Sequence, residues 1–149
     1  MTEMPTPARC PRPVLIAGLI WIVVGSMTVL FTALMLLLAL VFAPGDELAA
    51  VMDAAALATL FGALVGGAFL FVGVQTLRGA ARDTLGNGIG SIVLGSLSFI
   101  SGIVRIATGN IPRGLISMCW ACALVTAGIL ALAGRAEYGR WITAKRARA

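Results

Sequence analysis

The chain has 149 residues, of which 60% are hydrophobic and 11% are charged, and its formal net charge at pH 7 is +5. Soluble domains carry about 25% charged residues, and a soluble fold of this length has too small an interior for so many apolar side chains. The composition therefore excludes an ordinary soluble domain and predicts an integral membrane protein.

Four long segments of the chain contain no charged side chain at all: 13–45, 54–77, 84–104 and 114–134. A helix needs about 20 apolar residues to cross the hydrocarbon core of a bilayer. We therefore expect four membrane-spanning helices, at about 14–43, 54–77, 85–107 and 114–134. This predicts a single all-α domain over 14–134, an integral membrane four-helix bundle.

The two ends of the chain are more polar than the spans. Residues 1–13 are rich in proline and polar groups, which predicts a disordered tail. Arg9 and Arg12 would suit the basic region of a cleaved signal peptide, but the apolar run after them is longer than about 15 residues and no clear cleavage site follows. We therefore expect a retained first span. Residues 135–149 are predicted to form a basic juxtamembrane tail.

Basic residues are distributed unevenly between the two ends of the spans. Only Arg105 and Arg113 lie at the end that also carries Asp46, Glu47 and Asp53. The other nine lie at the end of the termini: Arg9, Arg12, Arg78, Arg82, Arg135, Arg140, Lys145, Arg146 and Arg148. Because positive charge near spans is retained in the cytoplasm, we expect both termini to be cytoplasmic. The excess of arginine over lysine is typical of GC-rich bacteria and favours the bacterial inner membrane.

The stretch GNGIGS, residues 86–91, comes close to the glycine-rich fingerprint of a dinucleotide-binding loop. That fingerprint requires a preceding strand and an acidic residue about 20 positions later. Here a spanning helix precedes the glycines, the third glycine comes one position early at Gly90, and the third span holds no acid. We therefore expect no nucleotide site in this stretch.

Small residues instead recur at helical spacing in the spans. Lipid is as apolar as leucine, so helices in a bilayer are joined by close approach of their backbones, which small residues permit. Spans two to four carry more such residues than span one, which predicts that they form the tight part of the bundle. Self-association of the chain through one of these stripes is the alternative. The residues expected to pack are Gly62, Gly66, Gly88, Ser91, Gly95, Ser98 and Gly102.

Cys119 and Cys122 form a C-x-x-C pair about six residues into the fourth span. We expect both to be packing residues, because cysteine behaves as a small apolar side chain. A redox pair is the alternative, since the arrangement resembles small four-helix quinone-linked thiol oxidoreductases. Those families need further cysteines, and Cys10 is predicted on the opposite side. With no histidine in the chain, we expect no metal, cofactor or catalytic residue.

Arg105 lies three residues after Gly102 and is predicted to face the other helices. Ionisable residues inside a membrane are candidates for functional sites, so one hypothesis is an anion site formed with Arg113. The alternative is a structural ion pair with Asp53, which is predicted at the same depth, or with Asp46 or Glu47.

The C-terminal segment places Tyr138 and an adjacent aromatic residue among basic side chains. Aromatic rings favour the headgroup level of a membrane, and juxtamembrane basic residues attract anionic lipid. The segment is predicted to contact anionic headgroups of the inner leaflet, and its charges also fix topology; no nucleic-acid partner is expected. The residues expected at the lipid surface are Arg140, Trp141, Lys145, Arg146 and Arg148.

The stretches AGLIWIVVGSMTVL, residues 17–30, and GGAFLFVGVQTLRGAARDTLGNGIGSIVLG, residues 66–95, resemble small bacterial four-span inner-membrane proteins of unknown function. The resemblance covers most of the hydrophobic chain and implies the same fold class and location, without any site residue. We expect a non-enzymatic structural or partner subunit. The alternatives are a small oligomeric transporter or channel with an arginine-lined outer mouth, and a thiol oxidoreductase that uses Cys119 and Cys122.

Overall fold

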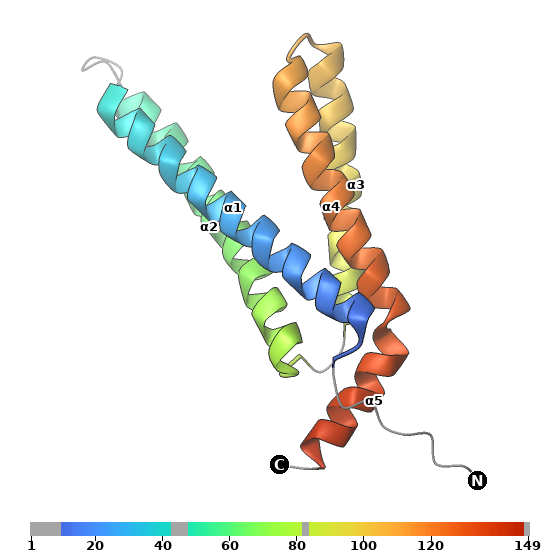
Figure 1. Cartoon of the computed structure of the whole chain (residues 1–149). Coiled ribbons are helices and arrows are strands. Elements are labelled where there is room, and N and C mark those ends of the chain that lie inside the picture. Colours follow the sequence, from blue (N-terminus) through green and yellow to red (C-terminus); the bar gives the residue numbers. More distant parts are fainter. Residues whose placement is uncertain (1–9, 43–47, 82–83, 148–149) are drawn as a thin grey trace.

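The structure is a computed structural model that describes residues 10–42, 48–81 and 84–147, with the side chains of residues 39, 42 and 48–59 left undescribed (Figure 1). Within this part of the chain there are five helices and no strand. They are α1 (Arg12–Phe42), α2 (Leu48–Arg78), α3 (Leu85–Ala107), α4 (Ile111–Ala133) and α5 (Arg135–Arg146). The all-α prediction is confirmed. The terminal segment over 135–149, expected only as a basic tail, contains a fifth helix.

Four of these helices are long and apolar enough to cross a membrane. Their apolar stretches are Arg12–Leu38, Leu60–Arg78, Leu85–Ala107 and Ile111–Ala133. At most 33% of the residues in the most apolar part of each helix are buried inside the protein, so most of their large apolar side chains face outward. Such a surface would be a liability in water and suits a hydrocarbon surrounding.

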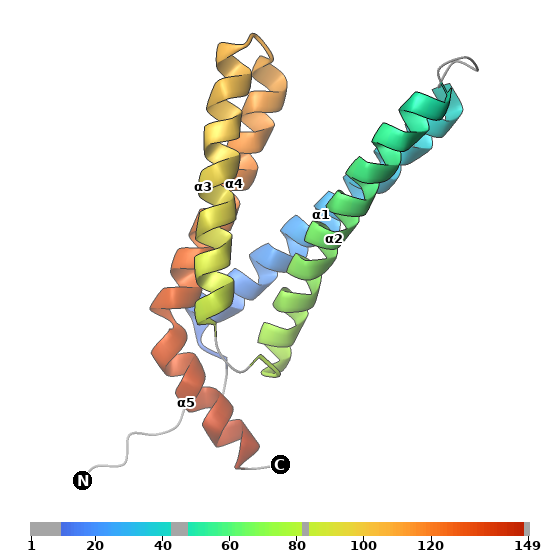
Figure 2. The ribbon, with the colours of Figure 1, turned by 180° about the vertical axis from the view of Figure 1, so that it is seen from behind.

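The four long helices form two antiparallel hairpins, α1 with α2 and α3 with α4, which diverge like the arms of a V (Figures 1 and 2). The arms meet where α1 contacts α4, at the end of the molecule where α1 begins and α5 lies. The prediction that spans two to four form the tight part of a bundle is therefore wrong. Span one is central because it packs on both α2 and α4.

Glycines explain why each hairpin is closely packed. A Cβ atom added at Gly25 of α1 would lie 2.6 Å from the carbonyl oxygen of Gly66 in α2. A Cβ atom added at Gly128 of α4 would likewise lie 2.6 Å from the carbonyl oxygen of Gly88 in α3. These contacts leave no room for a side chain, so the backbones approach as small residues allow in membranes. The first span looked poor in small residues, but each of its glycines faces a glycine of α2.

The glycine-rich stretch over 86–91 lies inside α3, which begins at Leu85, and not in a loop. Gly88 packs against α4, whereas a Cβ atom at Gly86 or Gly90 would meet nothing within 4 Å. Buried residues of this helix continue along the same face through Ser91, Gly95 and Gly102, and Ser98 is half-buried. The stretch therefore contributes one face of a helix–helix interface.

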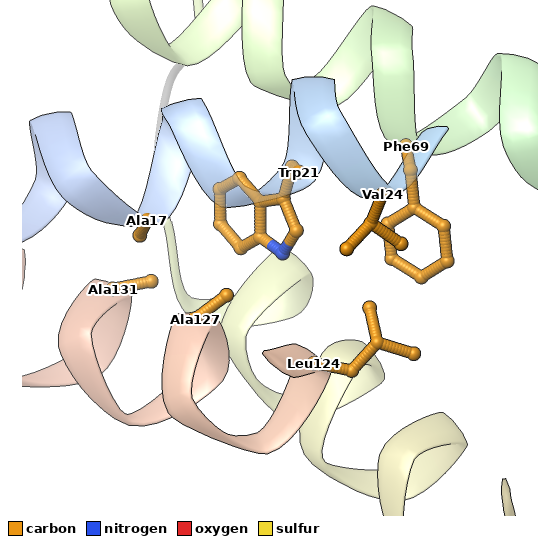
Figure 3. Close-up of a cluster of buried hydrophobic side chains, with 7 residues drawn as sticks. All are labelled: Ala17, Trp21, Val24, Phe69, Leu124, Ala127 and Ala131. Carbon is orange, nitrogen blue, oxygen red and sulfur yellow. The ribbon is translucent and has the colours of Figure 1, made fainter. Parts of the chain in front are cut away.

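The two arms are joined by a seam of buried apolar side chains from three helices (Figure 3). Trp21 of α1 is fully buried at its centre, and its indole Nε1 donates a hydrogen bond to Ser91 Oγ of α3 at 2.8 Å. Ser91 Oγ in turn donates to the carbonyl oxygen of Asn87 at 2.8 Å. The indole thus has the polar partner that a buried tryptophan requires. The members of the seam are Ala17, Trp21, Val24, Phe69, Leu124, Ala127 and Ala131.

Candidate functional site

A cleft of about 650 Å³ lies between the two arms of the V. All four long helices contribute to its wall, which is mostly apolar. At its narrow end it is bounded by Val24, Phe69 and Leu124, which belong to the seam. The other lining residues are Met27, Thr28, Phe31, Thr32, Val65, Leu94, Leu97, Ser98, Ser101, Ile116, Ser117 and Trp120. We call this space the inter-arm cleft.

The hydroxyl groups of the cleft wall differ in how they are bonded. Thr28 Oγ1 donates to the carbonyl oxygen of Val24 at 2.8 Å, and Thr32 Oγ1 donates to that of Thr28 at 2.7 Å. These two hydroxyls are therefore satisfied within α1. On the opposite wall, Ser101 Oγ of α3 accepts a hydrogen bond from Arg105 Nε at 3.5 Å. The contact connects the cleft with a cationic side chain at its wide end.

Arg105 and Arg113 lie at the wide end of the cleft, near the connection between α3 and α4. Arg105 follows the lining residue Ser101 by one helical turn, and Arg113 precedes the lining residue Ser117 by one turn. Both arginines are exposed. The expectation that Arg105 faces the neighbouring helices is wrong, because Ile106, and not Arg105, is the residue of the last turn of α3 that packs against Gly114 of α4.

The predicted ion pair between Arg105 and Asp53 receives no support from the arrangement of the helices. Asp53 lies in the first half of α2, outside the described side chains. The beginning of α2 and the end of α3 lie at the tips of the diverging arms (Figures 1 and 2). Asp46 and Glu47 lie outside the described residues altogether.

Cys119 and Cys122 are free and exposed on α4. Both lie in the interior of this helix, which begins at Ile111. Cys122 borders a shallow apolar groove between α3 and α4, beside Phe99 and Val125. Cys10, the third cysteine, is part-buried near α5, at the opposite end of the molecule. The described residues include no group of three potential metal ligands.

The helix α5 folds back beneath the two arms and packs on the start of α1 through a second buried cluster, Val14, Tyr138, Trp141 and Ile142. We call this cluster the terminal clasp. Its position beside α1 explains the glycine between α4 and α5: a Cβ atom at Gly134 would lie 3.3 Å from Pro13 Cβ and even nearer to Val14.

Three contacts tie the clasp to the end of α2. Tyr138 Oη donates a hydrogen bond to the carbonyl oxygen of Thr76 at 3.0 Å. The Trp141 ring lies so close to Gly79, which has a φ of +71°, that a Cβ atom there would be 2.9 Å from the ring. Lys145 Nζ donates to the carbonyl oxygen of Arg78 and lies 5.2 Å from the centre of the Trp141 ring, within cation–π range.

The sequence reasoning missed this docking. Trp141 was expected at the lipid surface, but its side chain is only 8% exposed and lies against the protein. Arg140, Lys145 and Arg146 are exposed, as lipid contact would require, and Arg148 lies outside the described residues. The available signal was the spacing of Tyr138, Trp141 and Ile142, which places three apolar side chains on one face of a helix.

Burial changes the acid–base behaviour of two groups in this region. Burial chiefly, and Cys10 secondarily, raise the pKa of Tyr138 from 10.0 to about 12, while Arg146 opposes the shift. Burial also raises the pKa of the Cys10 thiol above its usual 9.0, with Lys145 opposing. Both groups are therefore held in their neutral forms at pH 7.

The raised pKa of Tyr138 predicts a loss of clasp stability at high pH. Because the folded protein binds the phenol proton more tightly than the unfolded chain, this contribution is complete below pH 10 and is lost as the pH rises through 10 to 12. Tyr138 is the one tyrosine of the chain, so tyrosinate absorbance reports on it alone. We expect the rise in tyrosinate absorbance to have its midpoint near pH 12 in the native protein and near pH 10 after Trp141→Ala. Equal midpoints in the two proteins would contradict the burial of Tyr138 in the clasp.

Comparison with known proteins gives no family model that matches the chain, and no curated protein or solved structure that is similar to it.

Proposed function

We propose that this protein is a non-enzymatic component of the bacterial inner membrane, with both termini in the cytoplasm, whose inter-arm cleft holds an apolar partner. The observation that carries the proposal is the cleft itself, a space of about 650 Å³ walled by all four long helices. Its described wall offers apolar groups and hydroxyls, and no acidic or thiol side chain. Such a wall suits binding better than chemical turnover.

The nature of the cleft wall restricts what can fill it. Water in this space would find few polar partners, and a buried water molecule normally makes about three hydrogen bonds. An unfilled space would forfeit the dispersion contacts of the side chains that line it. Hydrocarbon satisfies both conditions, and the exposed apolar side chains of the four helices support a position of the cleft at the depth of the hydrocarbon core.

The orientation within the membrane follows from charge. The clasp end carries the exposed basic side chains Arg12, Arg78, Arg135, Arg140, Lys145 and Arg146, whereas the tip of the α3–α4 arm carries Arg105 and Arg113. Since positively charged ends remain in the cytoplasm, the clasp is cytoplasmic and the wide end of the cleft opens toward the outer side.

A topology experiment tests this placement. Alkaline phosphatase, which folds only outside the cytoplasm, is fused after Ala149 in one version and inserted at Gly109, between α3 and α4, in another. We expect enzyme activity from the Gly109 fusion alone and recovery of the protein in the membrane fraction. Activity from the Ala149 fusion, or recovery in the aqueous fraction, would overturn the proposal.

A second candidate function is that of a transporter whose arginine-lined mouth attracts anions. One observation favours it: the cleft opens at the end that carries Arg105 and Arg113 and is closed at the other end by the seam. This alternative requires anion flux through liposomes that contain the protein, with a clear reduction for Arg105→Ala. Flux at the background level of protein-free liposomes eliminates it.

A further inference from the structure

The cleft wall is better suited to a flexible chain than to another helix. Transmembrane helices associate through small residues, above all glycine, that let their backbones meet. The described wall of the inter-arm cleft contains no glycine, and most of its side chains are large, including Met27, Phe31, Leu97 and Trp120. Glycines at the interfaces are already occupied inside the hairpins, as in the pairs Gly25–Gly66 and Gly88–Gly128.

The shape of the space supports the same occupant. The arms converge on the seam at one end and diverge at the other (Figures 1 and 2). Along α1 the lining residues run from Val24 to Thr32, about 12 Å at 1.5 Å per residue. A rigid helix, about 10 Å wide, would clash with the converging arms near Phe69 and Leu124. A flexible hydrocarbon chain can follow the taper down to the seam.

The two arginines at the wide end differ in the direction of their side chains. In a helix every Cα–Cβ bond is tilted toward the N-terminus. Arg105, in the last turn of α3, therefore leans back toward the cleft, in agreement with its contact to Ser101. Arg113 lies in the first turn of α4 and leans away from the cleft. Arg105 is thus the cation available to an occupant of the cleft.

We propose that the inter-arm cleft binds a glycerophospholipid of the outer leaflet, with one acyl chain between the arms and its phosphate on the Arg105 guanidinium. A guanidinium presents parallel N–H donors that match the oxygens of a phosphate, and Ser101 Oγ lies beside it as a further polar group. The proposal rests on the proposed function and names the apolar partner. It also assigns a role to Arg105, which the packing of α3 does not use.

The test uses the purified full-length protein in dodecyl maltoside micelles, which contain no phosphate. Two photoreactive probes with the same diazirine-bearing acyl chains, a phosphatidylglycerol and a diacylglycerol, are added at equal limiting concentrations. After irradiation, the modified residues are mapped by mass spectrometry. Adducts in the cleft are counted at Leu97, Ile116 and Trp120, and adducts on outward faces at Phe71, Val93 and Ile129, which are exposed and lie outside the cleft.

We expect the phosphatidylglycerol probe to label the cleft about tenfold more than the diacylglycerol probe, with no such preference on the outward faces. Arg105→Gln should reduce this labelling to the diacylglycerol level. Arg113→Gln is the matched control, because it removes another exposed arginine near the same connection, and it should leave the labelling unchanged.

The outcomes separate this proposal from the proposed function. If both probes label the cleft equally, or if Arg105→Gln has no effect, the phosphate site is wrong while an apolar cleft remains. If neither probe labels the cleft above the outward faces, both the lipid site and the apolar partner are wrong. Cross-links between cleft residues of two protein copies would assign the cleft to self-association instead.

Discussion

Trp141→Ala is expected to release α5 from the two arms and to expose Cys10. Trp141 contributes the largest side chain of the terminal clasp, where it lies on Gly79 and under Lys145. Tryptophan-to-alanine substitutions in well-packed sites cost about 3–5 kcal/mol. Tyr138, Trp141 and Ile142 lie outside the apolar stretches of the spans. A loss of this size exceeds what the remaining contacts of a helix of 12 residues can offset.

Alkylation of Cys10 measures the release. Cys10 packs against the clasp, and burial raises the pKa of its thiol; release exposes the sulfur and increases the fraction of reactive thiolate. Cys119→Ser and Cys122→Ser leave Cys10 as the single thiol of the chain. With a membrane-impermeant maleimide on inside-out vesicles, we expect modification at least about tenfold faster in Trp141→Ala. The matched control is Arg140→Ala, the exposed neighbour, and an equal acceleration there would contradict the clasp.

Gly25→Ala is expected to destabilise the α1–α2 hairpin, because it adds a methyl group where the two backbones are in contact. The new Cβ would lie 2.6 Å from the Gly66 carbonyl oxygen and 2.7 Å from the Leu70 backbone nitrogen. These are backbone atoms, so the helices must move apart instead of a side chain turning away. Overpacking of this kind costs about 1–3 kcal/mol.

The α1–α2 arm also offers a matched control for this substitution. Gly67 lies next to Gly66 in α2, but a Cβ atom there would meet nothing within 4 Å. Gly67→Ala should therefore be neutral or stabilising by up to about 1 kcal/mol, through helix propensity. The measurement is the midpoint of unfolding in mixed micelles of increasing dodecyl sulfate content. Equal midpoints for the two variants would show that close approach at Gly25 does not hold the hairpin together.

The existence of the helices was predictable from the sequence because a charged side chain in hydrocarbon is costly. The uncharged gaps matched the described helices to within a few residues at α3 and α4, while α2 begins at Leu48, six residues before the expected start. A helix of this kind can continue past the hydrocarbon boundary, where polar groups are tolerated. The gaps therefore locate the spans better than they locate the ends of the helices.

The pairing of the helices was not predictable in the same way. A stripe of small residues such as Gly88, Gly95 and Gly102 identifies a packing face, but not the helix that covers it. The partner depends on register: Gly25 meets Gly66 and Gly88 meets Gly128 only at one offset of each antiparallel pair. The inter-arm cleft follows from this pairing, so its residues were not predicted as a group, although Arg105 at its mouth was recognised as a candidate.

The docking of α5 was hidden for a different reason. An aromatic residue among basic residues is typical both of a membrane interface and of a protein interface. Trp141 lies at a protein interface because its ring packs on Gly79, a residue 62 positions earlier in the chain. The backbone conformation of Gly79 makes room for the ring. A pattern confined to the C-terminal segment carries no information about that distant glycine.

The division into two hairpins also has a consequence for biogenesis. Each hairpin joins helices that are neighbours in the chain, so α1 and α2 can pack as soon as both have left the ribosome, and α3 and α4 can do so later as a second unit. The seam must wait for α4, and the clasp must wait for α5, which follows α4 in the chain. The 12 residues of α5 therefore fasten two hairpins that can each form before α5 is synthesised.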